Sequence, residues 1–145
     1  MYQEGPISWR SACQKCIATS SCEAEFVAGS AAAQEVAWLR SIFKGIDDRV
    51  AKAPTTLFIN NSGAAKLAAD AKASKRSKHI DIRYHHLRRC AADGIIAITR
   101  VSSAENVADI CAKPLDRIKF TGLRERLGMC IKDANEKPPE LKDVA

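Results

Sequence analysis

Three polar side chains occupy positions where α/β proteins often carry out chemistry. Asn60 ends the apolar stretch 57–60, Glu25 falls in the first turn of a predicted long helix, and Asp109 follows the last strongly predicted strand. The end of a buried strand is a common place for a catalytic or metal-binding acid. An acid in a first helical turn usually interacts with the helix dipole, and a helical aspartate is usually solvated. Together the three positions indicate a polar cluster at one edge of a sheet. Position 60, now Asn60, is either a site that has lost an acid or one that never held an acid.

A second group of residues with chemical potential is a basic stretch that spans residues 72–89. It contains all three histidines of the chain and one acid, Asp81. Such a stretch is either a phosphate-contacting surface, which gives salt-sensitive affinity for nucleic acid, or a solvated loop and helix face. The candidate nucleic-acid-binding residues are Lys75, Arg76, Lys78, His79, Arg83, His85 and Arg88.

Cysteine spacing gives little sign of a metal or redox site. Cys13 and Cys16 form one CxxC pair, without the second pair that a zinc site requires, and His85 and His86 are adjacent. The sequence shows no signal peptide and no apolar run long enough to span a bilayer. We therefore expect reduced thiols, an intracellular protein and no membrane contact.

Length and charge set the scale of the molecule and the nature of its partners. A chain of 145 residues with 46% hydrophobic residues can form one domain with a sizeable core, for which we predict residues 1–130. The remaining residues, 131–145, contain two adjacent prolines and alternating charges and are predicted to be a disordered tail. The formal net charge of +6 favours acidic partners, nucleic acid first.

Periodicity and capping signals predict the elements that would position these residues. Strands are predicted at 7–13, 54–60 and 95–101, with 17–19 as a short extension of the first, and the second is apolar enough to be buried. Helices are predicted at 20–44, 62–71, 81–93, 102–111 and 116–127. This order indicates an α/β layered domain with a mixed sheet.

Several motifs resemble the ribonuclease H domain of copia-type retrotransposon polyproteins. The stretches I-S-W at 7–9 and S-S-C-E-A-E-F-V-A at 20–28 resemble the family's I-S-W and S-S-T-E-A-E-Y-x-A. A-W-L-R at 37–40 resembles its A-x-W-L-R. S-K-H-I-D-I-R-Y-H at 77–85 resembles T-K-H-I-D-I-R-Y-H, and V-A-D-I-C-A-K-P-L at 107–115 resembles L-A-D-I-L-T-K-P-L. The resemblance covers nearly all of the chain except the tail.

The resemblance implies an RNase H-like fold that cleaves the RNA strand of RNA/DNA hybrids with four acids and two divalent ions, Mg²⁺ or Mn²⁺. By the matching motifs, Glu25 corresponds to the second acid and Asp109 to the fourth, and both are the expected metal ligands. The family's Y-C-D-N-Q-S-A aligns with F-I-N-N-S-G-A at 58–64, so the third acid falls on Asn60. The strand with the first acid precedes the I-S-W motif. The implied fold is a mixed sheet flanked by helices and lacking that first strand.

These matches leave three hypotheses open. With two acids absent, the nominal site charge falls from about −4 to about −2, which compensates two dications poorly. The chain could retain hybrid cleavage, could be a catalytically inactive nucleic-acid or protein-binding module, or could be a decayed reading frame. The absent strand would expose a sheet edge, which a homodimer or a swapped strand could cover.

Overall fold

The computed structural model describes residues 5–15, 17–47, 49, 52–69 and 81–129. These residues fall into two units, each considered by itself. The larger unit is Ala12–Asn106, and the smaller unit combines Met1–Ser11 with Val107–Ala145. The predicted boundary at residue 130 and the predicted tail lie at or beyond the end of the described residues.

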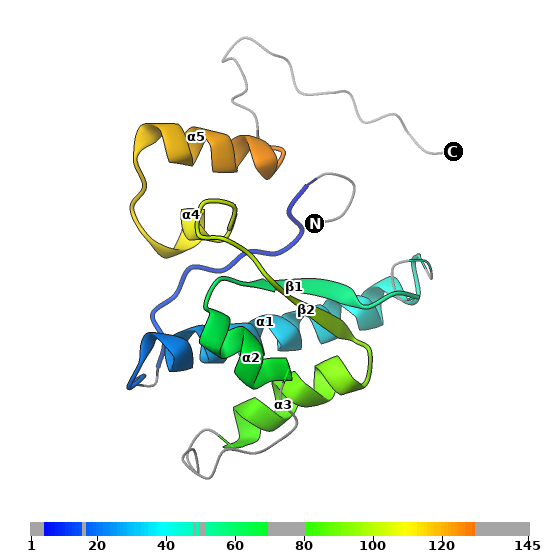
Figure 1. Cartoon of the computed structure of the whole chain (residues 1–145). Helices are drawn as coiled ribbons and strands as arrows, with labels where there is room; N and C mark the ends of the chain where they lie inside the picture. The colour runs from blue at the N-terminus through cyan, green and yellow to red at the C-terminus, as the bar shows by residue number, and fades with distance from the viewer. Residues whose placement is uncertain (1–4, 16, 48, 50–51, 70–80, 130–145) are drawn as a thin grey trace, which may run out of the picture. The chain divides into compact units, whose positions relative to one another are not determined.

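The larger unit consists of a two-stranded parallel sheet with helices against it. In chain order its elements are α1 (Ser21–Phe43), β1 (Thr55–Ile59), α2 (Ser62–Ala69), α3 (Asp81–Ala92) and β2 (Ile96–Arg100). The strands pair in the register Thr55↔Ile96 to Ile59↔Arg100. Figure 1 shows α1, α2 and α3 on the same side of the two strands.

Side-chain hydrogen bonds define where α1 begins and connect its last turn to β1. The Ser20 side chain accepts a hydrogen bond from the Glu23 N–H at 3.1 Å, as expected of an N-cap serine. The Thr19 hydroxyl and N–H in turn donate to the Glu23 carboxylate, and these bonds lower the pKa of Glu23. Near the other end, the Arg40 guanidinium donates to Thr55 Oγ1 at 3.1 Å and fixes the start of β1. The predicted helix 20–44 is confirmed to within a residue.

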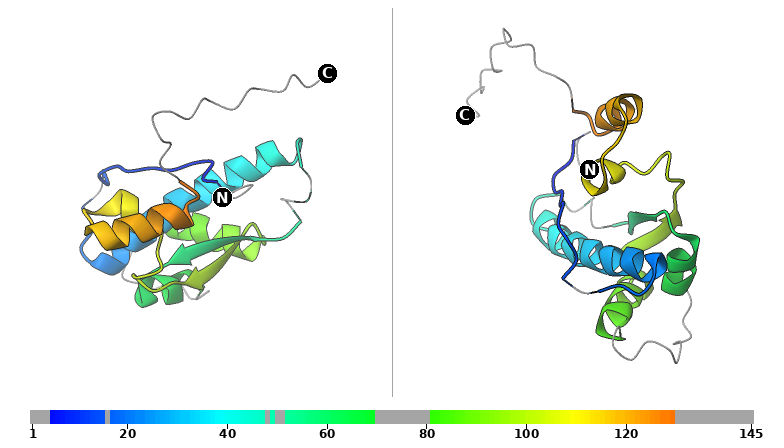
Figure 2. Two further views of the ribbon diagram at one scale, coloured as in Figure 1. Left: turned by 90° about the horizontal axis from the view of Figure 1, so that it is seen from above. Right: turned by 90° about the vertical axis from the view of Figure 1, so that its left-hand side faces the viewer.

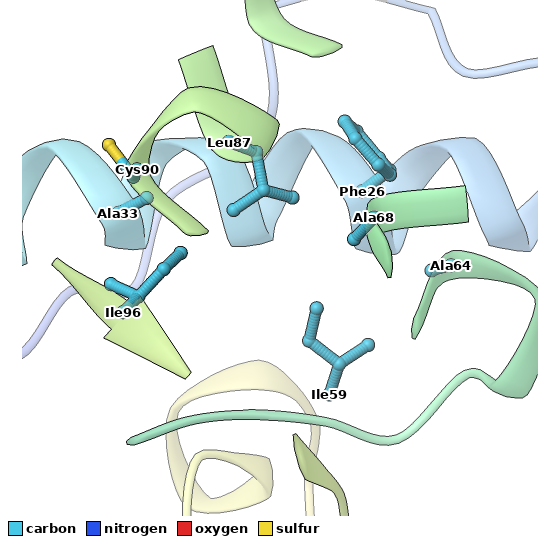
Figure 3. Packing of buried hydrophobic residues seen from close by; sticks show 8 residues of the cluster. All are labelled: Phe26, Ala33, Ile59, Ala64, Ala68, Leu87, Cys90 and Ile96. Atoms are coloured by element: carbon cyan, nitrogen blue, oxygen red, sulfur yellow. The ribbon is translucent and has the colours of Figure 1, made fainter. Parts of the chain in front are cut away.

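The core lies between the sheet and the three helices. In Figure 3, Ile59 and Ile96 extend from the strands toward the side chains of the helices. The buried members of the core are Phe26, Ala33, Ile59, Ala64, Ala68, Leu87, Cys90 and Ile96. Gly29 of α1 faces this core, where a Cβ would lie 3.4 Å from Ile59 Cδ1, an ordinary van der Waals distance. The buried face of α1 does not extend to its C-terminal end, where Ile42 is 39% exposed.

A glycine turn joins α3 to β2. Gly94 has φ 68°, the left-handed conformation that favours glycine. The Ile95 N–H donates to the Cys90 carbonyl at 2.9 Å and the Gly94 N–H to the Ala91 carbonyl at 3.2 Å, the pattern of a Schellman motif. This turn places Ile96 in the core directly after the helix ends, which confirms the predicted boundary at residues 93–94.

In its described residues the smaller unit holds two short helices, α4 (Asp109–Ala112) and α5 (Arg117–Arg126). Asp116 caps α5, accepting from the Lys119 N–H at 2.9 Å, and Leu123 is buried. After α5, Gly128 adopts φ 70° and ends the helix. The predicted helix 116–127 is confirmed.

Two strand predictions are wrong. Residues 7–13 and 17–19 form no strand; Figure 2 draws 7–13, at the dark-blue end of the chain, as plain trace without an arrow. Their alternating pattern favours a half-buried strand, but a strand requires a hydrogen-bonded neighbour, and Trp9 is 75% exposed. The sheet of the described residues is also parallel rather than mixed.

Two further expectations are corrected. The helix predicted to start at Ser102 begins only at Asp109, because Ser102 closes a local turn. Its carbonyl accepts from the N–H groups of Glu105 and Asn106, and its hydroxyl donates to the Glu105 carboxylate at 2.7 Å. The predicted burial of β1 also fails, since Phe58 is 57% exposed and only Ile59 is fully buried.

Candidate functional site

The larger unit brings Glu25 and Asn60 into contact. The Asn60 N–H, just after β1, donates to Glu25 Oε1 at 3.2 Å. Both residues are partly buried, and the bond joins α1 to the carboxyl end of β1. Glu25 lies just beyond the first turn of α1, where the first-turn acid is Glu23 rather than the predicted Glu25. The structure thus confirms that Glu25 and the end of β1 are adjacent.

The residue after Asn60, Asn61, has a structural role that was not predicted from the sequence. Asn61 Oδ1 accepts from the Gly63 N–H at 2.9 Å and the Ala64 N–H at 3.1 Å, and thereby caps α2. A Cβ at Gly63 would lie 3.1 Å from Asn61 Oδ1 and 3.2 Å from Cys22 Sγ, which is closer than most Cβ contacts. An asparagine directly before a helical stretch was the available signal. The two asparagines therefore differ: Asn61 is committed to the helix cap, and the side chain of Asn60 is not part of that cap.

Asp109 begins α4 in the smaller unit and is 3% exposed. Its Oδ2 lies 2.8 Å from Lys113 Nζ and 3.0 Å from Lys119 Nζ. Burial by itself raises the pKa of Asp109, but the hydrogen bonds and positive charges of Lys113 and Lys119 outweigh it, so the pKa is lowered overall. Asp109 is therefore an ionised carboxylate held by two lysines. Neither lysine was predicted as its partner from the sequence.

The described residues do not fit the two divalent ions that the resemblance implies. Among them, no group of three or more His, Cys, Asp and Glu side chains is arranged to hold a metal ion. Glu25 Oε1 accepts a backbone hydrogen bond, Asn60 contributes no charge, and Asp109 Oδ2 contacts two ammonium groups. Two hard dications require several carboxylates to offset their repulsion. The assignment of Glu25 and Asp109 as metal ligands stays a prediction.

The predicted nucleic-acid-binding residues are only partly within the described structure. Lys75, Arg76, Lys78 and His79 lie outside the described residues, as does the side chain of Arg83. His85 and Arg88 lie on α3, where His85 is exposed and Arg88 is half-buried. Nearby, Arg89 forms an exposed ion pair with Asp93 at 3.5 Å. Nucleic-acid contact by this surface stays a prediction.

The third histidine, His86, is half-buried on α3 and contacts a buried cysteine. Cys90 Sγ lies 3.6 Å from His86 Nε2, one helical turn apart on α3. Burial raises the pKa of the Cys90 thiol, and the charge of Asp93 adds to the rise against a smaller opposing effect of Arg89. The signal for this contact was the four-residue spacing on a predicted helix. Among the described residues, Cys13, Cys22, Cys90 and Cys111 are free thiols, and the reduced state stays a prediction.

In the part of the chain that the structure describes, no helix combines the length and apolar character needed to cross a bilayer.

Comparison with known proteins finds similarity to long transposon polyproteins. The chain is 32% identical over 128 residues, 88% of its length, to the "Retrovirus-related Pol polyprotein from transposon TNT 1-94" of Nicotiana tabacum. It is 33% and 32% identical, over 86% of its length, to the corresponding polyproteins from transposons RE1 and RE2 of Arabidopsis thaliana. It spans only 8–10% of the length of these curated relatives. No protein-family profile matches the chain, and no solved structure matches it significantly.

Proposed function

We propose that this chain, which is homologous to a segment of copia-type retrotransposon Pol polyproteins, is a ribonuclease H-like domain that binds nucleic acid but cleaves RNA/DNA hybrids weakly or not at all. The ribonuclease H assignment rests on the motifs at 20–28, 77–85 and 107–115. The loss of cleavage rests on the chemistry of the residues that would form the site.

The observation that carries the proposal is the contact between Glu25 and Asn60. Where a third acid is expected, β1 is followed by the neutral amide of Asn60. The backbone N–H of Asn60 donates a hydrogen bond to Glu25 Oε1, one of the two oxygens of the neighbouring carboxylate. An amide carbonyl can still coordinate a cation, but it adds no negative charge to balance one. This supports a site too weakly charged for chemistry that depends on two dications.

Retained binding is supported by charge. The chain carries a formal net charge of +6, and basic residues are concentrated in the stretch 72–89. The described part of that stretch, α3, presents His85 and Arg89 to solvent on the helix that packs against α1. Contacts of this kind to phosphates give affinity that falls steeply with salt and depends little on sequence.

A labelled RNA/DNA hybrid, incubated with the full chain in Mg²⁺ and in Mn²⁺, tests both parts of the proposal. We expect no cleavage, and binding that weakens as salt is raised. Asp109→Asn serves as the control for contaminating nuclease. Cleavage by the wild-type chain that disappears in Asp109→Asn would refute the loss of activity. Neither cleavage nor binding would favour the decayed reading frame.

A pair of matched variants tests whether position 60 is where charge was lost. Asn60→Asp restores a carboxylate at the end of β1, whereas Asn61→Asp adds the same charge one residue later and keeps a good helix cap. We expect Asn60→Asp to raise Mn²⁺-dependent hybrid cleavage relative to Asn61→Asp. Equal cleavage by the two variants would show that position 60 has no special relation to the reaction.

The two-stranded sheet of the described residues supports one further proposal, that two copies associate. The described sheet has two strands, so each strand has an edge without a strand partner among the described residues, and Phe58 on the face away from the helices is 57% exposed. Open edges of this kind readily pair with another chain. Sedimentation equilibrium should then show a dimer whose population falls in Phe58→Lys. A strictly monomeric wild-type chain would count against association.

A further inference from the structure

A buried carboxylate and two lysines form a compact charge cluster in the smaller unit. Both Lys113 Nζ and Lys119 Nζ contact the same oxygen, Oδ2 of Asp109, at 2.8 and 3.0 Å. Asp109 is 3% exposed, so its charge is largely removed from water. A buried carboxylate requires compensation by positive charge or hydrogen bonds, and here both come from the chain itself.

The local structure holds each lysine in place. Lys113 follows α4 directly, and its N–H donates to the Asp109 carbonyl at 3.3 Å. Lys119 lies in the first turn of α5, where its N–H donates to Asp116 Oδ1 at 2.9 Å. The ion pair of Asp109 with Lys119 therefore joins the start of α4 to the start of α5. The backbone of each lysine is held by its own hydrogen bond.

These lysines and a divalent ion would compete for one oxygen. A Mg²⁺ or Mn²⁺ ion bound to Asp109 Oδ2 would stand within a few ångströms of two ammonium charges, and juxtaposed like charges are strongly unfavourable. The ion would also have to displace two charge-assisted hydrogen bonds. The arrangement is self-sufficient without an added cation.

We propose that Lys113 and Lys119 take the place of a divalent cation at Asp109, so that this carboxylate fastens α4 to α5 and does not bind metal. The inference rests on the proposed function only in identifying Asp109 as the position of a family acid. It gives Asp109 a structural role that does not depend on a bound metal.

Mn²⁺ binding to the full, isotope-labelled chain tests this inference by NMR, through paramagnetic broadening of the backbone amides of residues 109–119. The wild-type chain should show no localised broadening in millimolar Mn²⁺. The double variant Lys113→Met/Lys119→Met removes both ammonium groups, and its Mn²⁺ affinity at this position should rise more than about tenfold. Adding Asp109→Asn to the double variant should abolish the gain.

A control variant separates local from overall charge. Lys15→Met/Lys52→Met removes two exposed lysines of the larger unit and lowers the net charge equally. It should leave Mn²⁺ binding near residue 109 unchanged. If the double variant at 113 and 119 does not fold, the single variant Lys113→Met should show a smaller gain, since that side chain is already half exposed.

Two outcomes would overturn the inference. One is localised broadening around residue 109 in the wild-type chain that Asp109→Asn removes. The other is a folded lysine variant that gains no Mn²⁺ affinity. Because the readout is metal occupancy in the absence of nucleic acid, either outcome leaves the proposed binding of hybrids to be judged by its own assay.

Discussion

Replacing Gly29 by alanine should stabilise the larger unit. Gly29 is buried in the interior of α1, where alanine is favoured over glycine by about 0.8–1.0 kcal/mol. The added Cβ would lie 3.4 Å from Ile59 Cδ1 and 3.7 Å from Leu87 Cδ2, which are ordinary van der Waals distances. We therefore expect Gly29→Ala to raise the free energy of unfolding by about 0.5–1 kcal/mol, the lower figure allowing for a small shift of Ile59.

Residue-resolved hydrogen exchange is the suitable assay, because the chain has two units and each can open separately. The protection of amides in α1, such as Ala33, reports the larger unit, and amides in α5, such as Leu123, report the smaller one. Gly122→Ala in α5 is the matched control. A Cβ at Gly122 meets no atom within 4 Å, so this variant should show the helix-propensity gain alone.

The two glycine variants separate the effect of packing from that of helix propensity. A loss of protection in α1 with a gain in α5 would mean that α1 packs more tightly on Ile59 than the distances indicate. A loss in both variants would refute the propensity argument itself. Gly29→Leu should be destabilising in either case, by about 1–3 kcal/mol, because the longer side chain overpacks the contact with Ile59 and Leu87.

Three other predictions concern the turn, the candidate site and pH. Gly94→Ala should lower the free energy of unfolding by about 1–2 kcal/mol in urea titrations, because φ 68° is strained for a residue with a Cβ. Glu25→Ala leaves the Asn60 N–H without its acceptor and should cost about 1–2 kcal/mol, whereas Glu25→Gln keeps an acceptor oxygen and should cost less than half as much. Burial raises the pKa of Cys90 in the folded state, so its contribution to stability is complete below the unfolded pKa, about 8.5, and is lost as pH rises through the folded value. The urea midpoint should therefore fall more steeply above pH 8.5 for the wild-type chain than for Cys90→Ala, and equal slopes would contradict this account.

Elements with local signals could be predicted from the sequence. The start of α1 follows from Ser20 and Glu23, and the end of α3 follows from Gly94, because caps and left-handed glycines act over a few residues. The strand predicted at 7–13 failed because alternation describes only one side of a pairing, and the partner is not encoded in the same stretch. The helix predicted from residue 102 failed because the Ser102 side chain and carbonyl form a competing turn.

At the candidate site, too, contacts set by local signals could be predicted, and a contact across a turn could not. That Glu25 meets the end of β1 was predictable, since both follow from one helix and one strand with clear boundaries. Lys113, four residues after Asp109, has the spacing of a helical ion pair, but Lys119 could not be predicted as a partner, because it is ten residues away and reaches Asp109 only through the turn between α4 and α5. Charge partners across a turn depend on geometry that residue spacing does not define.

The parallel pairing of β1 and β2 has a consequence for how the chain is made. Each hydrogen bond between them closes a loop of about 40 residues that includes α2 and α3, so sheet formation is entropically slow and cannot begin until β2 exists. At a synthesis rate of roughly 5–20 residues per second, β1 waits about two to eight seconds for its neighbour to be synthesised. During that time Leu57, Phe58 and Ile59 form an unpaired apolar segment on a nascent chain. Early docking of β1 onto α1, aided by the Arg40–Thr55 hydrogen bond, would shelter this segment until the sheet can close.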